Sequence, residues 1–304
     1  MIGVLALGLI AAGIYGMFAV GIVLVYRGTR VLTFAGGEVG TASLYVAAWL
    51  VTDHHAPWFV GALAAVAFAA ALGAAFELLL VRRSAQQGAD ADPVVTSILT
   101  VGLLVTLLAV ELRAYGASPK TLDPPVHGGV TVGGVVMSGT QIAAIVVAAA
   151  LGFGLQAALR RTDFGLGVLA AADDPSAARL VGVPLARVRM SLWAGSFALA
   201  ALAALLVEPT VGVITPGYAS TLYLDGLAAA VIGKLTSLPG AVGGALAIGL
   251  AESAATRYLS SWDLPGMNFL VVLVLLLVTL LGRAYGPSLR RRLEGRLRVA
   301  EATA

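Results

Sequence analysis

Long apolar stretches recur along the whole chain, and they constrain its fold more than any other feature of the sequence. A helix that crosses the hydrocarbon core of a membrane needs about 20 mostly apolar residues. Short clusters of charged residues, proline and glycine separate the stretches. We place nine of them near residues 2–26, 31–51, 58–81, 93–114, 139–159, 188–207, 218–233, 240–258 and 267–281. The sequence therefore predicts an all-α polytopic membrane protein with about eight or nine transmembrane segments.

The composition disfavours a soluble protein and a transmembrane barrel. Hydrophobic residues make up 59% of the chain and charged residues 12%, whereas a soluble domain has about 45–50% and about 25%. A barrel strand alternates apolar and polar residues over about ten positions, and the run from Phe269 to Leu281 does not alternate. Because the chain has no cysteine, disulfides and thiolate metal sites are excluded.

The positions of the basic residues predict the topology. If all nine segments cross, 16 of the 19 lysines and arginines fall on one side, and only Arg113, Lys120 and Arg257 fall on the other. Basic loops favour the cytoplasm. The N-terminus is therefore expected outside and the C-terminus inside, with a transmembrane domain over residues 1–282 and a basic cytoplasmic tail over 283–304.

Two of the segments are expected to be broken or short. Glycines at 36, 37 and 40 surround Glu38 in segment 31–51, which predicts a discontinuous helix. Segment 218–233 would span only about 24 Å of a core about 30 Å thick, and it contains Asp225. Irregular backbone at membrane depth is tolerated where protein or a watery cavity covers it.

Two connections between the segments are long. In the cytoplasmic segment 160–189, Asp174 is a helix cap, Pro175 suits the first helical position and Gly182 suits the stop, which predicts a helix over Pro175–Val181. Such a short helix must pack on something, either its own membrane domain or a soluble partner. The external loop 115–138 is rich in proline and glycine, which predicts irregular structure.

The sequence offers no constellation for chemistry of its own. His54, His55 and His127 lack the spacing of metal ligands, and Gly233-Lys234 lacks the glycine and the hydroxyl residue of a phosphate-binding loop. We therefore expect no catalytic, cofactor-binding or metal-binding residues in this chain, and no nucleic-acid partner.

Acidic residues in apolar segments are more informative, because a charge at the bilayer centre is costly. Glu77 and Glu208 lie near segment ends and are expected at the membrane interface. Glu38 and Glu252 lie deeper. Both structural pairing and a place on a solute path remain open for these two residues.

Several motifs together are specific to one family of proteins. The cytoplasmic segment contributes Thr162–Gly165, Ala170–Pro175, Ala178–Val183 and Arg187–Val188. The rest of the chain contributes Tyr15, Ala19–Gly21, Val25–Tyr26, Thr33–Glu38, Gly212–Pro216, Ala228–Gly233, Leu238–Ala241, Gly243–Gly244 and Glu252. With these motifs the chain resembles the permease subunits of high-affinity branched-chain amino-acid ABC importers.

The resemblance implies partners, cofactors and site residues. The expected partners are a second permease subunit, sister or identical, two ATPase subunits, an extracytoplasmic solute-binding protein and the lipid bilayer of a bacterial cytoplasmic (inner) membrane. ATP and Mg²⁺ would bind the ATPase subunits. The residues expected to couple to the ATPase are Phe164, Asp174, Pro175, Ala177, Ala178, Arg179, Leu180 and Gly182. Those expected on the solute path are Phe34, Gly36, Gly37, Glu38, Thr215, Pro216 and Tyr218.

Departures from the family pattern leave the substrate open. Thr33 and Gly36 replace the asparagine and histidine that are usual there, and Lys234 with Leu235-Thr236 breaks a glycine-rich run. Branched-chain or related amino acids are the expected solutes, with urea, amides or small organic acids as alternatives. A secondary transporter coupled to an ion through Glu38, Asp225 or Glu252 is a rival function.

Overall fold

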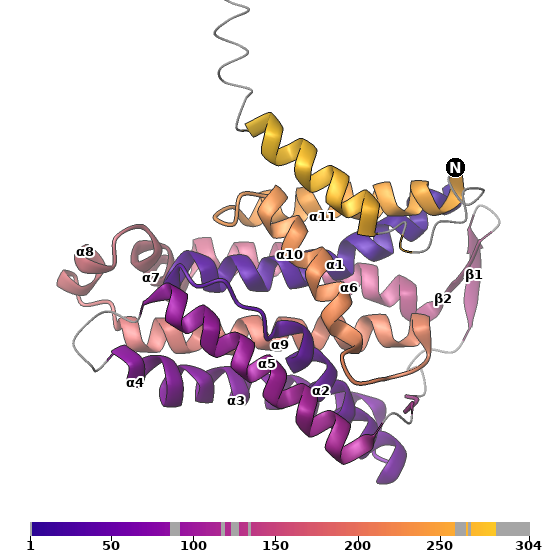
Figure 1. Ribbon diagram of the computed structural model, residues 1–304, viewed down its shortest axis with the longest axis horizontal. Coiled ribbons are helices and arrows are strands. Elements are labelled where there is room, and N and C mark those ends of the chain that lie inside the picture. Colours follow the sequence, from indigo (N-terminus) through magenta and orange to yellow (C-terminus); the bar gives the residue numbers. More distant parts are fainter. Residues whose placement is uncertain are drawn as a thin grey trace, which may run out of the picture.

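The computed structural model (Figure 1) describes residues 2–85, 92–116, 119–122, 128–132, 135–258, 266 and 269–283. Apart from Arg283, the predicted basic tail lies outside the described residues. The first half of the chain forms α1 (Ile2–Thr29), α2 (Gly36–Ala48), the π-helical turn η1 (Trp49–Asp53), α3 (Trp58–Phe76), the π-helical turn η2 (Glu77–Val81), α4 (Arg82–Ala85) and α5 (Pro93–Tyr115). The second half forms β1 (Gly129–Val132), β2 (Val135–Ser138), α6 (Gly139–Arg161), α7 (Asp163–Asp173), α8 (Pro175–Leu180), α9 (Leu185–Val211), α10 (Tyr218–Ile232), α11 (Leu238–Tyr258) and a last helix, Phe269–Arg283.

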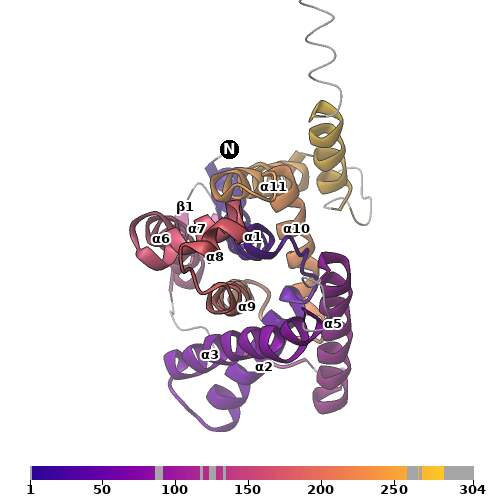
Figure 2. The same cartoon turned by 90° about the vertical axis from the view of Figure 1, so that its left-hand side faces the viewer.

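Helix α1 forms the centre of the bundle. It contacts α6, α9, α10 and α11, and Figure 2, which looks along α1, shows these neighbours grouped around it. Ile22, Val23 and Val25 are fully buried. A helix that is apolar on every side belongs in the middle of a bundle. Helix α5, by contrast, lies at the outer edge (Figure 2).

The described residues contain five helices that are long and apolar enough to cross a membrane. They are Gly3–Thr29, Trp58–Ser84, Pro93–Tyr115, Leu185–Glu208 and Leu238–Tyr258. The helices Tyr218–Ile232 and Phe269–Arg283 are apolar but shorter, and α2 and α6 coincide with the other two expected segments. The chain is therefore a multi-pass helical membrane protein. The count of nine crossings and the orientation stay predictions.

Both segments expected to be irregular depart from regular spanning helices. Residues 30–34 have no regular structure, and α2 begins only at Gly36. The glycines do not interrupt α2, so that part of the prediction is wrong. They lie in its first turns because α10 packs closely there: a Cβ on Gly37 would lie 2.5 Å from the Cα of Ser220. Helix α10 is short, with 15 residues.

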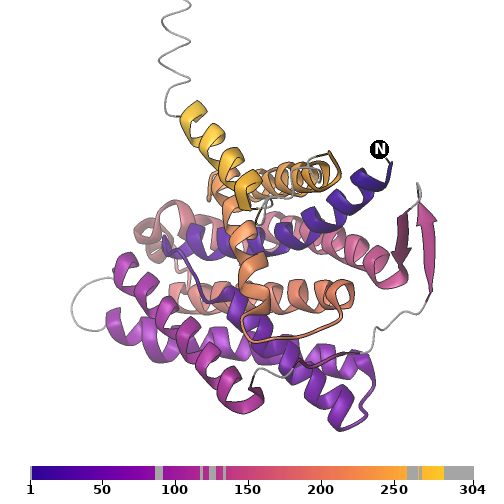
Figure 3. The same cartoon turned by 45° about the vertical axis from the view of Figure 1, so that its right-hand side comes forward.

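The external loop is not wholly irregular, contrary to the prediction. Its strands β1 and β2 pair antiparallel, with Val130 opposite Met137 and Val132 opposite Val135. Valine-rich runs on either side of a two-glycine sequence are a hairpin signal. Figures 1 and 3 show the strands at one end of the bundle, with α4, α7 and α8 at the other.

A matched pair of glycines in α11 tests how close the helices lie. A Cβ on Gly244 would overlap the carbonyl of Ala229 in α10, whereas a Cβ on Gly243 would meet nothing within 4 Å. Overpacking typically costs about 1–3 kcal/mol. Gly244→Ala should therefore lower the thermal unfolding midpoint measured in detergent, whereas Gly243→Ala should keep or raise it. Equal midpoints for the two variants would contradict this packing.

Candidate functional site

Glu38 joins the start of α2 to the start of α10. Its side chain is 2% exposed, and its Oε1 accepts a hydrogen bond of 2.8 Å from the hydroxyl of Ser220. Beside it, the Oγ1 of Thr41 accepts a bond of 3.0 Å from the amide of Ala219. Because both helices begin here, the positive ends of two helix dipoles stabilise negative charge at Glu38.

Glu111 of α5, which is not among the predicted path residues, lies beside Glu38. The Glu111 side chain is 3% exposed, and the two carboxyl groups are neighbours. Oε2 of Glu38 and both carboxyl oxygens of Glu111 accept no hydrogen bond of good geometry from the described residues, although the amide of Gly217 and the other carboxyl group lie close to them. The sequence contained a signal for Glu111, because an acidic residue inside an apolar segment is costly and therefore marks a candidate functional position.

Helix α5 covers this pair and the non-helical segment before α2. The amide of Leu32 donates to Oγ of Ser97 (3.3 Å), and the amide of Phe34 donates to Oγ1 of Thr100 (3.1 Å). Near the other end of α5, Tyr115 stacks on Tyr45 with ring centroids 4.2 Å apart. Hydroxyls of α5 thereby satisfy amides that irregular backbone leaves unpaired at membrane depth.

The structure brings the two stretches of predicted path residues together. The hydroxyl of Tyr223 donates to the carbonyl of Thr33 (2.9 Å), and a Cβ on Gly217 would lie 3.6 Å from Oε1 of Glu38. Around these contacts, Gly36, Gly37 and Glu38 are buried, and Phe34, Thr215, Pro216 and Tyr218 are half-buried. The polar side chains at this contact form one group, which we call the Glu38 centre: Glu38, Glu111, Ser220 and Thr41.

Residues 160–189, predicted to lie on the cytoplasmic side, contain the predicted short helix and one more. Asp174 caps α8 (Pro175–Leu180): its Oδ1 accepts a bond of 3.0 Å from the amide of Ala177. Gly182 has φ +87°, where glycine avoids strain. Val181 lies just beyond the helix. The additional helix, α7, has Thr162 as its cap. The Oγ1 of Thr162 accepts a hydrogen bond of 3.0 Å from the amide of Gly165.

The exposed surface of α7 and α8 differs from the prediction at one residue. Ala178 is only 2% exposed, so its side chain faces the protein and does not belong to the outer surface. Ala177 and Arg179 are exposed. Leu180 and Val181 are 89% and 79% exposed, and Phe164 is 54% exposed. We call Phe164, Arg179, Leu180 and Val181 the apolar edge, although Arg179 adds a charge.

Three other buried acids, Glu77, Glu208 and Glu252, have partners inside the protein. Glu77, expected at the interface, is 2% exposed and pairs with Arg189, with Oε1 and Nε 3.2 Å apart. Glu208 is also buried, and its Oε1 accepts a hydrogen bond of 3.2 Å from the amide of Leu122. Oε2 of Glu252 accepts a hydrogen bond of 2.8 Å from the hydroxyl of Tyr15. Pairing across helices supports a structural role for Glu252.

Arg283, where the basic tail is predicted to begin, caps the C-terminal end of α10. Its guanidinium donates to the carbonyl of Val231 (3.0 Å) and to that of Ile232. These are the last carbonyls of α10, which have no partner within the helix. A cation at this end also complements the helix dipole.

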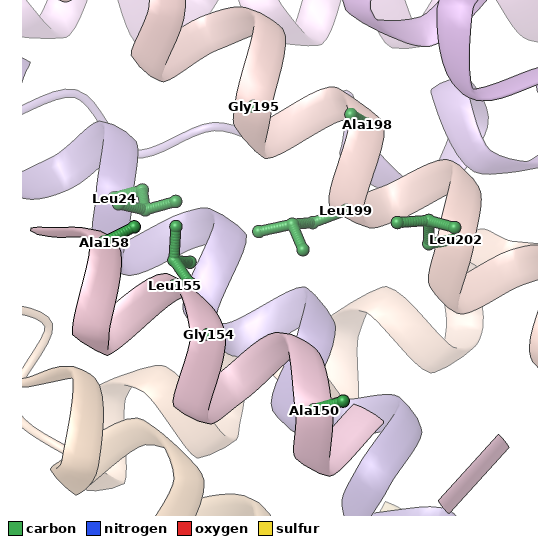
Figure 4. A pocket seen from close by; sticks show the side chains of 9 residues that line it. All are labelled: Leu24, Ala150, Gly154, Leu155, Ala158, Gly195, Ala198, Leu199 and Leu202. Carbon is green, nitrogen blue, oxygen red and sulfur yellow. The ribbon is translucent and has the colours of Figure 1, made fainter. Parts of the chain in front are cut away.

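A pocket between α1, α6 and α9 is lined only by alanine, glycine and leucine residues (Figure 4). It has a volume of about 330 Å³ and is lined by Leu24, Ala150, Gly154, Leu155, Ala158, Gly195, Ala198, Leu199 and Leu202. A small polar solute needs a few placed hydrogen-bonding groups, so this cavity suits hydrocarbon instead. In the part of the chain that the structure describes, no three His, Asp or Glu side chains are grouped to hold a metal ion.

Comparisons with known proteins agree with this architecture. Residues 4–281 match the family described as "Branched-chain amino acid transport system / permease component". The high-affinity branched-chain amino acid transport system permease protein BraD of Pseudomonas aeruginosa is 28% identical over 257 residues, which cover 81% of this chain and 83% of that protein. LivH of Escherichia coli K12, described in the same words, is 26% identical over 284 residues, covering 89% and 91%.

A solved structure has a similar fold. The structure of PsaBC from Streptococcus pneumoniae in complex with Fab contains a chain with a TM-score of 0.50 and 16% identity, covering 90% of this chain and 89% of that one. This likeness concerns the fold alone. Because the family match runs over nearly the whole chain, from residue 4 to residue 281, this protein belongs to the branched-chain amino acid transport system permease component family.

Proposed function

We propose that this chain is the membrane-spanning permease subunit of an ATP-driven importer of branched-chain or related amino acids in a bacterial cytoplasmic membrane. The family match over residues 4–281 carries the proposal. The sequence has no phosphate-binding loop, so ATP and Mg²⁺ bind two partner ATPase subunits. A second permease subunit and an external solute-binding protein complete the importer. The chain crosses the membrane nine times, with its N-terminus outside.

The Glu38 centre suits the ammonium group of an amino acid on its way across. Three carboxyl oxygens of Glu38 and Glu111 accept no hydrogen bond of good geometry from the described residues, and an ammonium group offers three N–H donors. The centre is enclosed by α5, which lies at the edge of the bundle (Figure 2). The solute reaches the centre when α5 moves outward from α2.

The apolar edge and α8 form the contact with the ATPase. Exposed leucine, valine and phenylalanine next to one arginine offer apolar area and one charge that fixes orientation. The edge lies at the end of the bundle where α1 and α6 end in Arg27, Arg160 and Arg161. That end faces the cytoplasm by the rule that basic loops stay inside.

Reconstitution tests the proposed function. The tagged chain, purified from its own cells with its associated subunits and placed in proteoliposomes, should take up leucine, isoleucine or valine only when ATP and the binding protein are present. Uptake driven by an ion gradient without ATP would show a secondary transporter instead. ATP-dependent uptake of urea or short amides, with none of amino acids, would correct the substrate.

A further inference from the structure

An ion pair between a buried carboxylate and a half-buried arginine ties α9, the helix that follows residues 160–184, to its neighbour α3. Glu77 lies in η2, at the cytoplasmic end of α3, and is 2% exposed. Its Oε1 is 3.2 Å from Nε of Arg189, the fifth residue of α9. Trp193, fully buried one turn further along α9, lies beside the same carboxyl group. A buried carboxylate needs such partners, because it has given up its hydration.

The chain between α8 and α9 is stiff. The amide of Val183 donates to the carbonyl of Ala178 (3.0 Å), and that of Gly182 donates to the carbonyl of Arg179 (3.1 Å). On the α9 side, the amide of Val188 donates to the carbonyl of Pro184 (3.1 Å). Only residues 181–184 separate the two helices. A displacement of α8 therefore carries the start of α9, including Arg189, with it.

Helices α3 and α9 also pack without space between them. A Cβ on Gly73 would lie 2.5 Å from the carbonyl oxygen of Trp193. The rings of Phe76 and Trp193 have centroids 4.8 Å apart, and those of Trp193 and Phe197 are 5.8 Å apart. The helix changes to π-helical geometry directly at Glu77, and such turns are frequent at functional sites.

We propose that Glu77 and Arg189 are positioning residues for energy coupling: their ion pair makes α3 follow α8 and α9 when the ATPase subunits move the cytoplasmic segment. The inference rests on the proposed function. Without the pair, α8 still binds the ATPase, but its movement no longer reaches α3. ATP hydrolysis then continues while solute uptake falls.

The test measures ATP hydrolysis and amino-acid uptake together in proteoliposomes that contain the complete importer. Glu77→Gln and Arg189→Gln should each raise the ATP consumed per solute about tenfold, the size of a typical coupling between two sites. The amount of co-purified ATPase should stay near that of the unmodified protein. The thermal unfolding midpoint should fall most in Arg189→Gln, because that variant leaves the buried carboxylate of Glu77 without its cation. The double exchange Glu77→Arg with Arg189→Glu should restore the amount of ATP consumed per solute to that of the unmodified protein.

Arg83→Gln is the matched control, because it removes an exposed cation from α4, next to η2. The ATP consumed per solute by Arg83→Gln should equal that of the unmodified protein. A normal ratio in Glu77→Gln or Arg189→Gln would overturn the inference. So would a failure of both variants to assemble while the double exchange assembles, since the pair would then be structural only. If the unmodified importer shows no ATP-dependent uptake, the proposed function itself fails, and this inference falls with it.

Discussion

Replacing Glu111 by glutamine should reduce amino-acid uptake by about tenfold or more, because a hydrogen bond to a charged group contributes about 1.5–3 kcal/mol. The glutamine amide would donate to the free Oε2 of Glu38, which removes acceptors that a passing ammonium group needs. Glu38→Gln should have a similar effect. The measurement is the initial rate of ATP-dependent leucine uptake at several solute concentrations.

Two further measurements separate a path role from a structural role for Glu111. The thermal unfolding midpoint of Glu111→Gln should stay equal or rise, since the new amide pairs with Glu38. Glu252→Gln is the matched control: it also changes a buried carboxyl group, but one that accepts a bond from Tyr15, and its uptake should stay near normal. Normal uptake in Glu111→Gln would refute a place for this residue on the solute path.

Changes at the apolar edge should release the ATPase. Leu180 is 89% exposed in the isolated chain, and burying a leucine contributes about 1.5–3 kcal/mol. Leu180→Glu should therefore lower the co-purified ATPase about tenfold or more. Asp174→Ala should weaken docking less, because the lost cap costs about 0.5–2 kcal/mol. The affinity of the external solute-binding protein should not change.

The control for Leu180 is another exposed leucine. Leu63 of α3 is 71% exposed, and the apolar helix in which it lies, Trp58–Ser84, is long enough to cross the membrane. Leu180→Ala should reduce the co-purified ATPase, whereas Leu63→Ala should not. Bulk introduced at Ala178 is unsuitable for this test, because Ala178 is buried and a larger side chain would disturb the packing of α8. If Leu180→Glu still binds a full complement of ATPase, α8 is only a connector.

The local pattern of the sequence was enough for the apolar helices and for α8, but not for the β-hairpin or for α7. Apolar runs of about 20 residues predicted the helices that are long enough to span. In lipid a helix must satisfy its backbone hydrogen bonds internally, and it needs no distant contact to do so. The cap at Asp174 and the stop at Gly182 were likewise readable, since each acts within one helical turn. The family resemblance depended on motifs spread along the chain, and the match over residues 4–281 confirmed it.

Only the tertiary structure decided which side chains meet. Glu38 and Glu111 are 73 positions apart in the sequence, and Glu77 and Arg189 are 112 apart, so no local pattern could pair them. The burial of Ala178 likewise depends on the packing of α8. The sequence by itself determined a multi-pass helical protein and the capped helix α8, because those features depend on neighbouring residues. The partners of its buried charges depend on how helices distant in the sequence pack, and packing was decided by the whole fold.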